Sequence, residues 1–236
     1  MKRPLIGVTS DYLVSERGRP WSNSACLASY ADALDLAGAI PMILPLASKT
    51  FCGDALARLD GIILSGGDDI PAEAFGQTAH PKSHPLPKER WDSECMWLNA
   101  ALDANKPVLG ICLGMQTMCV AAGAEILQDI PDLCPNAFTH GTPSRKHPHE
   151  IDLVSGTMLS RFAPTPRVSI CSSHHQAVKS VPAPYTLAAL SPDGIIEAVE
   201  DPTRPFVVGV QWHPERNDAQ PDWLLTAFVQ HCAETL

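Results

Sequence analysis

The sequence predicts an α/β protein with a mostly parallel central sheet flanked by helices and a β-rich C-terminal third. Three observations predict this fold class. Short apolar runs alternate with helix-forming segments through the first half of the chain. One of these runs, 108–111, passes through a short turn of small residues directly into a helix-forming segment. In the last third, apolar runs follow one another with little helix between them.

The first half contains the alternation that a parallel sheet requires. Its short apolar runs predict strands at 5–9, 42–44, 61–64 and 108–111. Helical spacing is clearest in residues 88–105, where an apolar face is formed by Trp91, Cys95, Leu98 and Leu102. The other helices are expected at 25–37, where Gly38 ends the segment, around 54–59, and at 115–122.

The last third is expected to consist mainly of strands. An irregular, proline-bearing stretch at 131–148 precedes it. The strands are predicted at 151–154, 167–171, 186–190, 195–200 and 206–210. The turn sequence Ser191-Pro192-Asp193-Gly194 predicts that the two strands beside it form an antiparallel hairpin. An amphipathic helix at 221–233 follows.

Length and composition indicate one globular domain. A chain of 236 residues with 45% hydrophobic and 18% charged residues is long enough to fill an α/β core. No linker, internal repeat or low-complexity tract divides it, so we expect residues 1–236 to form a single domain.

Charge and hydropathy exclude several classes of partner. The net charge of −9 and the lack of a basic run argue against nucleic-acid binding. The chain turns polar by Thr9, too early for a secretory signal, and no apolar segment is long enough to cross a membrane. We therefore expect a cytoplasmic protein with no membrane contact, and the sequence leaves a homodimer open.

Cysteine and histidine spacing predicts neither disulfides nor a metal. The eight cysteines are irregularly spaced without a Cys-x-x-Cys pair, so reduced thiols are expected. The histidine pairs at 147–149 and 174–175 lack cysteine or carboxylate at zinc spacing. We expect no metal and no cofactor.

Cys112 occupies the junction between the run 108–111 and the helix after it, with Gly110 two residues before and Gly114 two residues after. This Gly-x-Cys-x-Gly pattern is typical of a nucleophile elbow, which presents one side chain at a sharp strand-to-helix turn. Glycines let the segments pack closely there, and the helix dipole favours a thiolate. A buried structural cysteine fits the same pattern, so the nucleophile interpretation requires a partner base.

His213 is the expected base. It follows the apolar run 206–210, so it should also lie at a strand end, and Glu215 comes two residues later. In an extended segment residues i and i+2 point the same way, which would let the carboxylate orient the imidazole. Pro214 between them favours an extended conformation at His213. An isolated His-Pro-Glu is often structural, but this setting favours catalysis.

Two other histidines compete for the role of base. His174 and His175 follow the expected strand 167–171, but no acid stands among residues 172–177. A supporting or substrate-wall role therefore fits them better. Cys171 is the rival thiol, but no glycine turn presents it.

The loop that follows the strand 61–64 is expected at the same edge of the sheet as Cys112. Its adjacent glycines, Gly66 and Gly67, could aim backbone N–H groups at an oxygen, as an oxyanion hole requires, or form a plain turn. Residues 71–88, rich in proline and histidine, are expected to form a wall or lid of the site. Glu94 on the helix 88–105 is either solvated or a contact for a ligand's ammonium group.

These residues together resemble the class I glutamine amidotransferase-like superfamily. Its two active-site signatures are similar to Gly-Ile-Cys-Leu-Gly-Met-Gln at 110–116 and Gln-Trp-His-Pro-Glu at 211–215. Within it, the chain is most similar to cysteine hydrolases of the γ-glutamyl-γ-aminobutyrate hydrolase type, peptidase family C26. The supporting stretches are 64–70, 172–178, 191–198 and Arg90 with Glu94. The likeness runs from the first strand to the last helix and implies a flavodoxin-like fold.

The resemblance implies a catalytic triad of Cys112, His213 and Glu215, with oxyanion donors from the backbone of Gly67 and Leu113. The expected substrate contacts are Gln116, Arg90, Glu94, His174, His175 and Gln176.

Two positions depart from the hydrolase pattern. Such hydrolases often carry arginine after the nucleophile, where Leu113 stands here, and an acid after the helix arginine, where Trp91 stands here. Both departures leave the substrate open and neither affects the triad.

The expected function is hydrolysis of a γ-glutamyl amine, such as γ-glutamyl-γ-aminobutyrate, through a γ-glutamyl thioester on Cys112, with release of glutamate and the amine. One alternative is a glutaminase subunit that supplies ammonia to a separate synthetase. The loop at 66–69 differs from the Gly-Gly-Pro-Gly form typical of those enzymes. The other alternative is a catalytically silent binding or regulatory protein on the same fold.

Overall fold

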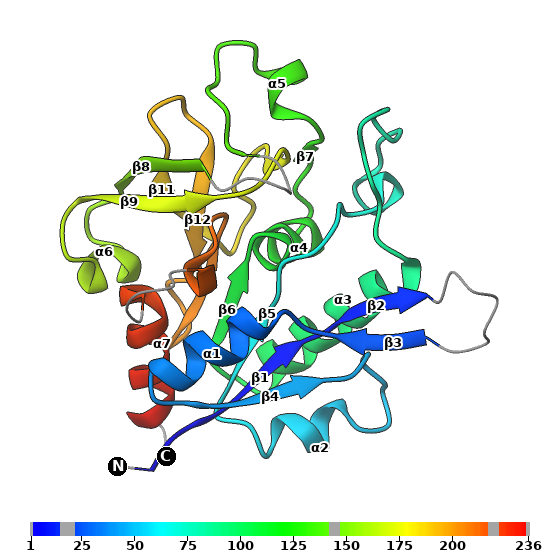
Figure 1. The fold of residues 1–236 in the computed structure, drawn as a ribbon, viewed down its shortest axis with the longest axis vertical. Coiled ribbons are helices and arrows are strands. Elements are labelled where there is room, and N and C mark those ends of the chain that lie inside the picture. The colour runs from blue at the N-terminus through cyan, green and yellow to red at the C-terminus, as the bar shows by residue number, and fades with distance from the viewer. Residues whose placement is uncertain (1, 15–21, 142–146, 217–221, 235–236) are drawn as a thin grey trace.

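The computed structural model describes residues 2–14, 22–141, 147–216 and 222–234. One large sheet runs through these residues, and its first half is parallel (Figure 1). The parallel strands, in their order across the sheet, are β4 (Ile40–Leu44), β1 (Leu5–Thr9), β5 (Gly61–Leu64), β6 (Val108–Ile111) and β13 (Val207–Val210).

The second half of the sheet is antiparallel and continues from β13. Its strands are, in order, β12 (Ile196–Glu200), β11 (Thr186–Leu190), β8 (His147–Leu153) and β9 (Arg167–Ser172). The hairpin predicted around Ser191-Pro192-Asp193-Gly194 is formed by β11 and β12. The predicted fold class, with a parallel sheet first and a β-rich final third, is therefore confirmed.

Helices cover both faces of the sheet (Figure 1). The helices on one face are α1 (Ala28–Leu36), α6 (Met158–Phe162) and α7 (Trp223–Glu234), and those on the other are α2 (Cys52–Leu56), α3 (Lys88–Asp103) and α4 (Leu113–Ala121). Successive residues of β5 alternate between the two cores, with Ile63 in the first and Ile62 and Leu64 in the second. Burial on both faces explains why this strand is a continuous apolar run.

The remaining elements are short. They are the hairpin of β2 (Asp11–Val14) and β3 (Ser22–Ala25), the pair β7 (Ile126–Leu127) and β10 (Ala177–Val178), the helix α5 (Ile130–Leu133), and the 3-10 turns η1 (Ala72–Phe75) and η2 (Pro214–Arg216).

The sequence did not predict the short helices α5 and α6, the pair β7–β10 or the hairpin β2–β3. The hairpin has no clear polar–apolar alternation, and because it extends to Ala25, α1 starts at Ala28 rather than at residue 25. β8 begins at His147, within the stretch expected to be irregular. The sequence did not predict this start because a proline such as Pro148 is uncommon inside a strand. The other predicted strands and helices end within three residues of the observed ones; residues 142–146 and Pro221 lie outside the described part.

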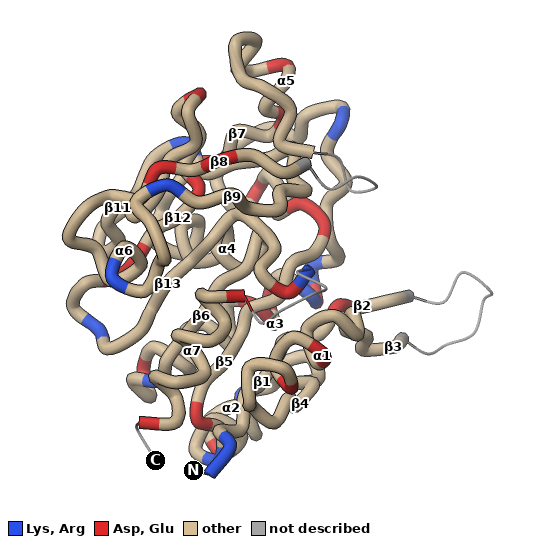
Figure 2. The backbone as a smooth tube through the Cα atoms, turned by 60° about the vertical axis from the view of Figure 1, so that its left-hand side comes forward, with Lys and Arg blue, Asp and Glu red and all other residues tan. Residues whose placement is uncertain are grey.

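Charged side chains are dispersed over this fold. Figure 2 shows Lys and Arg scattered along the chain rather than gathered on one face. Among the helices of the described residues, none is both long and apolar enough to cross a membrane.

Candidate active site

Three neighbouring parallel strands position the site. β6 lies between β5 and β13, with Gly110 opposite Leu64 and Ile111 opposite Val210. Because the three strands are parallel, the segments after them meet at one edge of the sheet, where ligands of open α/β sheets bind. These segments carry the glycine loop, Cys112 and His213.

Cys112 has the backbone of a nucleophile elbow, with φ 52° and ψ −103°. A positive φ is unfavourable for a residue with a side chain and persists only where the surroundings impose it. Here the Cys112 N–H donates to the Val210 carbonyl at 2.8 Å, which ties the turn to β13. This hydrogen bond therefore holds the strained turn, and with it the sulfur, at the end of β6.

Both glycines of the elbow are required by close packing. A Cβ at Gly110 would lie 2.6 Å from Met118 Sδ and 2.8 Å from the Gly114 carbonyl carbon, and a Cβ at Gly114 would collide with the Leu64 carbonyl oxygen. These contacts let α4 start directly beside β5 and β6. The Gly-x-Cys-x-Gly pattern is thus explained by sterics.

His213 is held by Glu215 and faces Cys112. Its Nδ1 lies 2.7 Å from Glu215 Oε1, and both side chains are buried. Burial alone would lower the pKa of His213, but the charges of Glu215 and Cys112 and hydrogen bonds to both raise it to about 9. The ring can therefore be an imidazolium at neutral pH.

The His213–Glu215 contact forms differently from the prediction. The sequence interpretation placed the two residues on one side of an extended segment, whereas Pro214–Arg216 is a 3-10 turn. In that turn the Arg216 N–H donates to the His213 carbonyl at 3.2 Å. The carboxylate reaches the ring because the chain folds back.

Gln211 is a site residue that the sequence analysis did not assign. Its Nε2 donates to Cys112 Sγ at 3.4 Å, and its Oε1 accepts from Gln116 Nε2 at 3.2 Å. Gln116 Nε2 also lies 3.4 Å from the Gln176 carbonyl oxygen. The amide of Gln211 thus links the sulfur to the expected substrate contacts. Gln211 could have been identified from the sequence, because it is the first residue of Gln-Trp-His-Pro-Glu at 211–215.

The glycine loop presents backbone donors beside the sulfur. The Gly66 N–H donates to Tyr30 OH at 2.8 Å, which fixes the loop. A Cβ at Gly67 would lie 2.7 Å from Leu113 Cδ2, so this loop and the start of α4 are in close contact. Within the described ranges, the N–H groups of Gly67 and Leu113 donate to no protein acceptor. Unpaired backbone donors of this kind are what an oxyanion hole requires.

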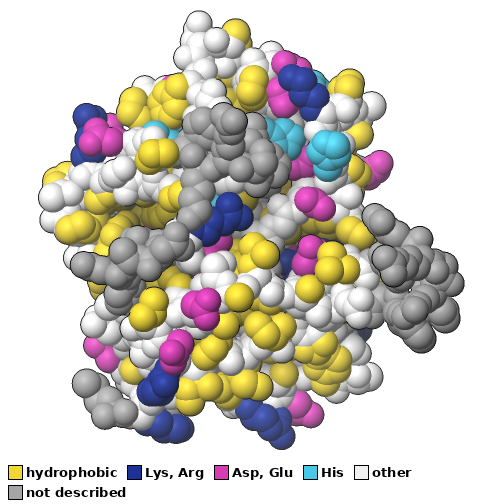
Figure 3. Space-filling view, viewed as in Figure 1, with side chains coloured by type: hydrophobic (Ala, Val, Ile, Leu, Met, Phe, Trp, Pro, Cys, Tyr) yellow, Lys and Arg dark blue, Asp and Glu magenta, His cyan; other side chains and the backbone are white. Residues whose placement is uncertain are grey.

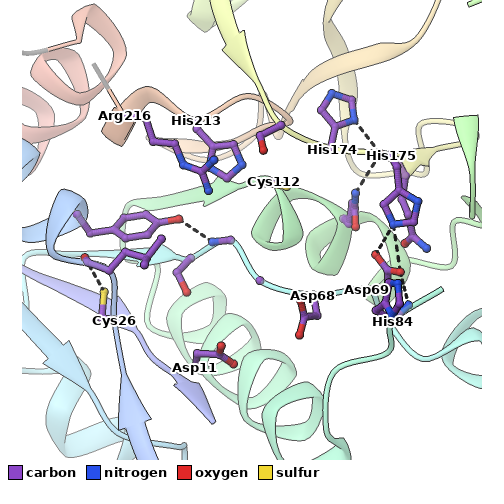
Figure 4. A pocket seen from close by; sticks show the side chains of 18 of the residues that line it. Asp11, Cys26, Asp68, Asp69, His84, Cys112, His174, His175, His213 and Arg216 are labelled. Atoms are coloured by element: carbon purple, nitrogen blue, oxygen red, sulfur yellow. Dashed lines mark hydrogen bonds and ion pairs between the residues drawn. The ribbon is translucent and has the colours of Figure 1, made fainter. Parts of the chain in front are cut away.

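A cavity of about 460 Å³ opens over these groups. In Figure 4, His213 and Arg216 lie on one side of Cys112, and Asp68, Asp69, His84 and His175 lie on the other. The expected site residues that line the cavity are Gly67, Cys112, Gln116, His174, His175, Gln176 and His213. Lining residues that the sequence analysis did not name as site residues include Asp11, Cys26, Tyr30, Asp68, His84 and Arg216. The wall predicted at 71–88 is represented in it by His84.

Arg90 and Glu94 lie away from the cavity surface. Both are fully buried, they form an i,i+4 ion pair in α3, and neither is among the residues that line the cavity. Arg90 donates to the Ser10 carbonyl and, at 2.8 Å, to Ser65 Oγ. The structure thus places this pair beneath the glycine loop, as a support for it. This placement does not favour the expected role of Arg90 and Glu94 as substrate contacts, because neither side chain lines the cavity.

The expectation that no acid accompanies His174 and His175 is wrong. His175 Nε2 lies 3.1 Å from Asp69 Oδ1 and its Nδ1 lies 3.2 Å from Asp129 Oδ2. Hydrogen bonding to Asp69 raises the pKa of His175. His174 Nδ1 donates to the Gln176 carbonyl at 2.9 Å, and Nε2 lies 3.6 Å from Glu197 Oε1.

These acids come from segments distant in the sequence, so the local sequence gave no sign of them. Both nitrogens of His175 face these acids, and those of His174 face the Gln176 carbonyl and Glu197. His213 is therefore the ring beside Cys112.

Figure 3 shows histidine side chains at the surface together with acidic ones on the upper right of the molecule.

Asp11, Asp68 and Asp69 form an acidic wall of the cavity. Burial, together with the charges of Asp11 and Asp69, raises the pKa of Asp68. A cationic group bound there would relieve this repulsion.

Several known proteins are similar to this chain. The family model of peptidase C26 matches residues 4–215. A γ-glutamyl-γ-aminobutyrate hydrolase of Escherichia coli O157:H7 is 31% identical over 252 residues, covering 99% of this chain and 97% of that protein.

A putative glutamine amidotransferase of Mycobacterium tuberculosis is 34% identical over 224 residues, covering 91% of this chain and 70% of that protein. Among solved structures, the glutaminase domain of a Trypanosoma brucei CTPS with bound acivicin aligns with a TM-score of 0.67 at 17% identity, covering 98% of this chain and 94% of that one. The last likeness is one of fold.

Proposed function

The chain belongs to the peptidase C26 family, and on that premise we propose that it hydrolyses γ-glutamyl amides through a thioester on Cys112. The observation that carries the proposal is the strained elbow cysteine beside an imidazole that is itself hydrogen-bonded to a buried carboxylate. This is the nucleophile, base and orienting group that covalent acyl transfer requires. In this proposal residues 1–236 act as one domain, because the site draws on loops from Gly66 to Glu215.

The first half-reaction forms the thioester. The Cys112 thiolate attacks the γ-carbonyl carbon, and the oxygen that becomes negative accepts hydrogen bonds from the Gly67 and Leu113 N–H groups. The imidazolium of His213 then gives its proton to the amine nitrogen as the C–N bond breaks. The products are the free amine and a γ-glutamyl group bonded to sulfur.

The second half-reaction releases glutamate. His213, now neutral, takes a proton from a water molecule that attacks the thioester carbon. The C–S bond breaks, and the proton on His213 restores the ion pair with the thiolate. Glu215 stabilises the imidazolium in both steps without changing its own charge.

The cavity walls support an amino-acid substrate. A volume of about 460 Å³ is in the range of small-molecule sites. The acidic wall of Asp11 and Asp68 suits the α-ammonium group of a γ-glutamyl moiety, and the Arg216 guanidinium, on the other side of Cys112 from Asp68, suits its α-carboxylate. The amine that leaves would then occupy the remaining space.

The test compares wild type with Cys112→Ser on γ-glutamyl-γ-aminobutyrate, other γ-glutamyl amines and free glutamine. Glutamate release should fall about 10⁴-fold or more in the variant. Mass spectrometry of quenched wild type should show a γ-glutamyl adduct on Cys112. Cys134→Ala, a thiol on the end of α5, is the matched control and should keep full activity. Undiminished turnover by Cys112→Ser would refute the proposal.

A glutaminase that serves a synthetase is the second candidate, favoured by the amidotransferase name of one relative and by Leu113 after the nucleophile. It predicts glutamine hydrolysis that appears only when a partner synthetase is added. A silent binding protein would leave Cys112 unreactive toward iodoacetamide.

A further inference from the structure

A second cluster of chemically active side chains lies on the antiparallel side of the sheet. His140, His149, His174 and Glu197 each bring one nitrogen or oxygen atom to within 4.8 Å of the others. They come from the loop before β8, from β8, from the loop after β9 and from β12. All are buried except His149, which is partly buried.

The distances in this cluster are those between ligands of one metal ion. Glu197 Oε1 lies 3.0 Å from His140 Nδ1, 3.5 Å from His149 Nε2 and 3.6 Å from His174 Nε2. A tetrahedral zinc ion bonded to nitrogen and oxygen at about 2.0–2.2 Å holds neighbouring ligand atoms about 3.3–3.5 Å apart. The three distances from the carboxylate oxygen to the ring nitrogens are close to this spacing.

The outer nitrogen of each ring fixes the tautomer that metal binding needs. His140 Nε2 lies 2.9 Å from Asp193 Oδ2, His149 Nδ1 lies 3.1 Å from the Glu150 carbonyl, and His174 Nδ1 lies 2.9 Å from the Gln176 carbonyl. Carbonyl and carboxylate oxygens only accept, so each outer nitrogen carries the hydrogen. In the neutral rings, the lone pairs then point inward at one place, which is the usual outer-shell pattern around a bound metal.

The inward atoms lack good hydrogen bonds. Among the described residues, His140 Nδ1, His174 Nε2 and both oxygens of Glu197 are buried without a hydrogen bond of acceptable geometry. The remaining ring nitrogen, His149 Nε2, lies 2.8 Å from Ser172 Oγ. Buried polar atoms are rarely left unsatisfied, so a common partner at the centre is indicated.

The charges around that centre balance a divalent cation. Glu197 contributes one negative charge directly, and Asp193 contributes a second through His140. With three neutral imidazoles, a dication would make the buried cluster neutral. Imidazole and carboxylate ligands suit Zn²⁺ among the common divalent metals.

We propose that His140, His149, His174 and Glu197 bind one Zn²⁺ ion in a closed, four-coordinate structural site. The ion would tie the loop after β9, whose residues His174, His175 and Gln176 line the cavity, to β8 and β12. The sequence predicted no metal because these four ligands come from separate segments and share no local spacing.

The competing occupant is a proton. Burial alone would lower the pKa of His140, but Glu197 and Asp193 raise it, so a metal-free cluster could hold an imidazolium–carboxylate pair. The two occupants differ in a direct way, because only the metal site binds one equivalent of Zn²⁺ and releases protons on binding.

The experiment titrates chelator-treated full-length protein with Zn²⁺ and, separately, with Co²⁺. Wild type should take up one Zn²⁺ per chain, show a higher Tm with Zn²⁺ present, and give the intense visible absorption of four-coordinate Co²⁺. His149→Ala, which removes the most exposed ligand, and Glu197→Gln should weaken binding by more than the about 10–100-fold expected for Asp193→Asn in the outer shell.

His80→Ala, a histidine outside the cluster, is the matched control and should bind as wild type does. Because the Co²⁺ spectrum is measured on wild type, a variant that does not fold leaves the test intact. Wild type that binds no more Zn²⁺ than His149→Ala, or that gives a weak octahedral Co²⁺ spectrum, would overturn the proposal. Neither result depends on the proposed hydrolase activity.

Discussion

His213 Nδ1 and Glu215 Oε1 lie 2.7 Å apart where the chain enters the 3-10 turn Pro214–Arg216, with the other edge of the ring facing Cys112. The contact defines which nitrogen holds a hydrogen toward Glu215 and so which nitrogen serves the sulfur. The Glu215 carboxylate in this position can affect catalysis only through the His213 ring. A substitution of Glu215 therefore measures that contribution alone.

Glu215→Gln should lower kcat/KM for the best γ-glutamyl amide by about 10²–10⁴-fold, because the amide keeps the shape but cannot stabilise the imidazolium. The stability of the fold should change far less than the rate. Glu89→Gln, on the exposed first turn of α3, controls for loss of a carboxylate and should be silent. An equal loss in both variants would contradict the role assigned to Glu215.

The loss of activity at alkaline pH should report the protonation of the His213–Cys112 pair. Because the pKa of His213 is raised from 6.5 to about 9, the imidazolium that protonates the leaving amine is present at neutral pH and is lost as pH rises through about 9. We expect kcat/KM to fall there, and the fall to move to lower pH in Glu215→Gln.

The raised pKa of His213 should also make the folded protein less stable as pH rises. A raised folded-state pKa contributes stability that is complete below pH 6.5 and disappears as pH rises through about 9. Urea unfolding between these pH values measures it. A stability that rises across this window in wild type but not in His213→Gln would contradict the assignment.

Gly114→Ala should destabilise the protein by at least about 1–3 kcal/mol, because the new Cβ collides with the backbone of Leu64 and β5 cannot move freely. The matched control is Gly53→Ala in α2, where a Cβ meets nothing within 4 Å. There alanine should be neutral or stabilise by up to about 1 kcal/mol. Urea unfolding of both variants checks the contrast, and equal stabilities would disprove the steric account of the elbow.

Arg90→Met should cost about 3–5 kcal/mol, because it leaves the fully buried Glu94 without its partner and removes the donor to Ser10 and Ser65. The double variant Arg90→Met/Glu94→Leu should recover much of the stability but not the activity, since the glycine loop still lacks its support.

Lys88→Met provides the control for the Arg90 prediction. It breaks the exposed i,i+4 pair with Asp92 in the same helix and should cost about 0.5 kcal/mol or less. Full activity in the double variant would show that Arg90 does not position the loop.

The sequence predicted those parts of the fold and site that arise from short-range constraints. The apolar runs identified the strands of the sheet, since strands buried on both faces must be apolar throughout. The two glycines around Cys112 and the carboxylate two residues from His213 are likewise local patterns. They marked the residues that the structure brings together, although the extended geometry expected for His213 and Glu215 was wrong.

Tertiary structure alone decided which distant segments meet. Gln211 contacts the sulfur because β13 lies beside β6, and the Tyr30 hydroxyl reaches the glycine loop from α1. His175 finds Asp69 and Asp129, and Glu197 finds three imidazoles, across segments that share no local pattern. The physical reason is that steric and periodic signals act over a few residues, whereas hydrogen bonds, ion pairs and metal ligands depend on distances fixed only when the sheet has formed.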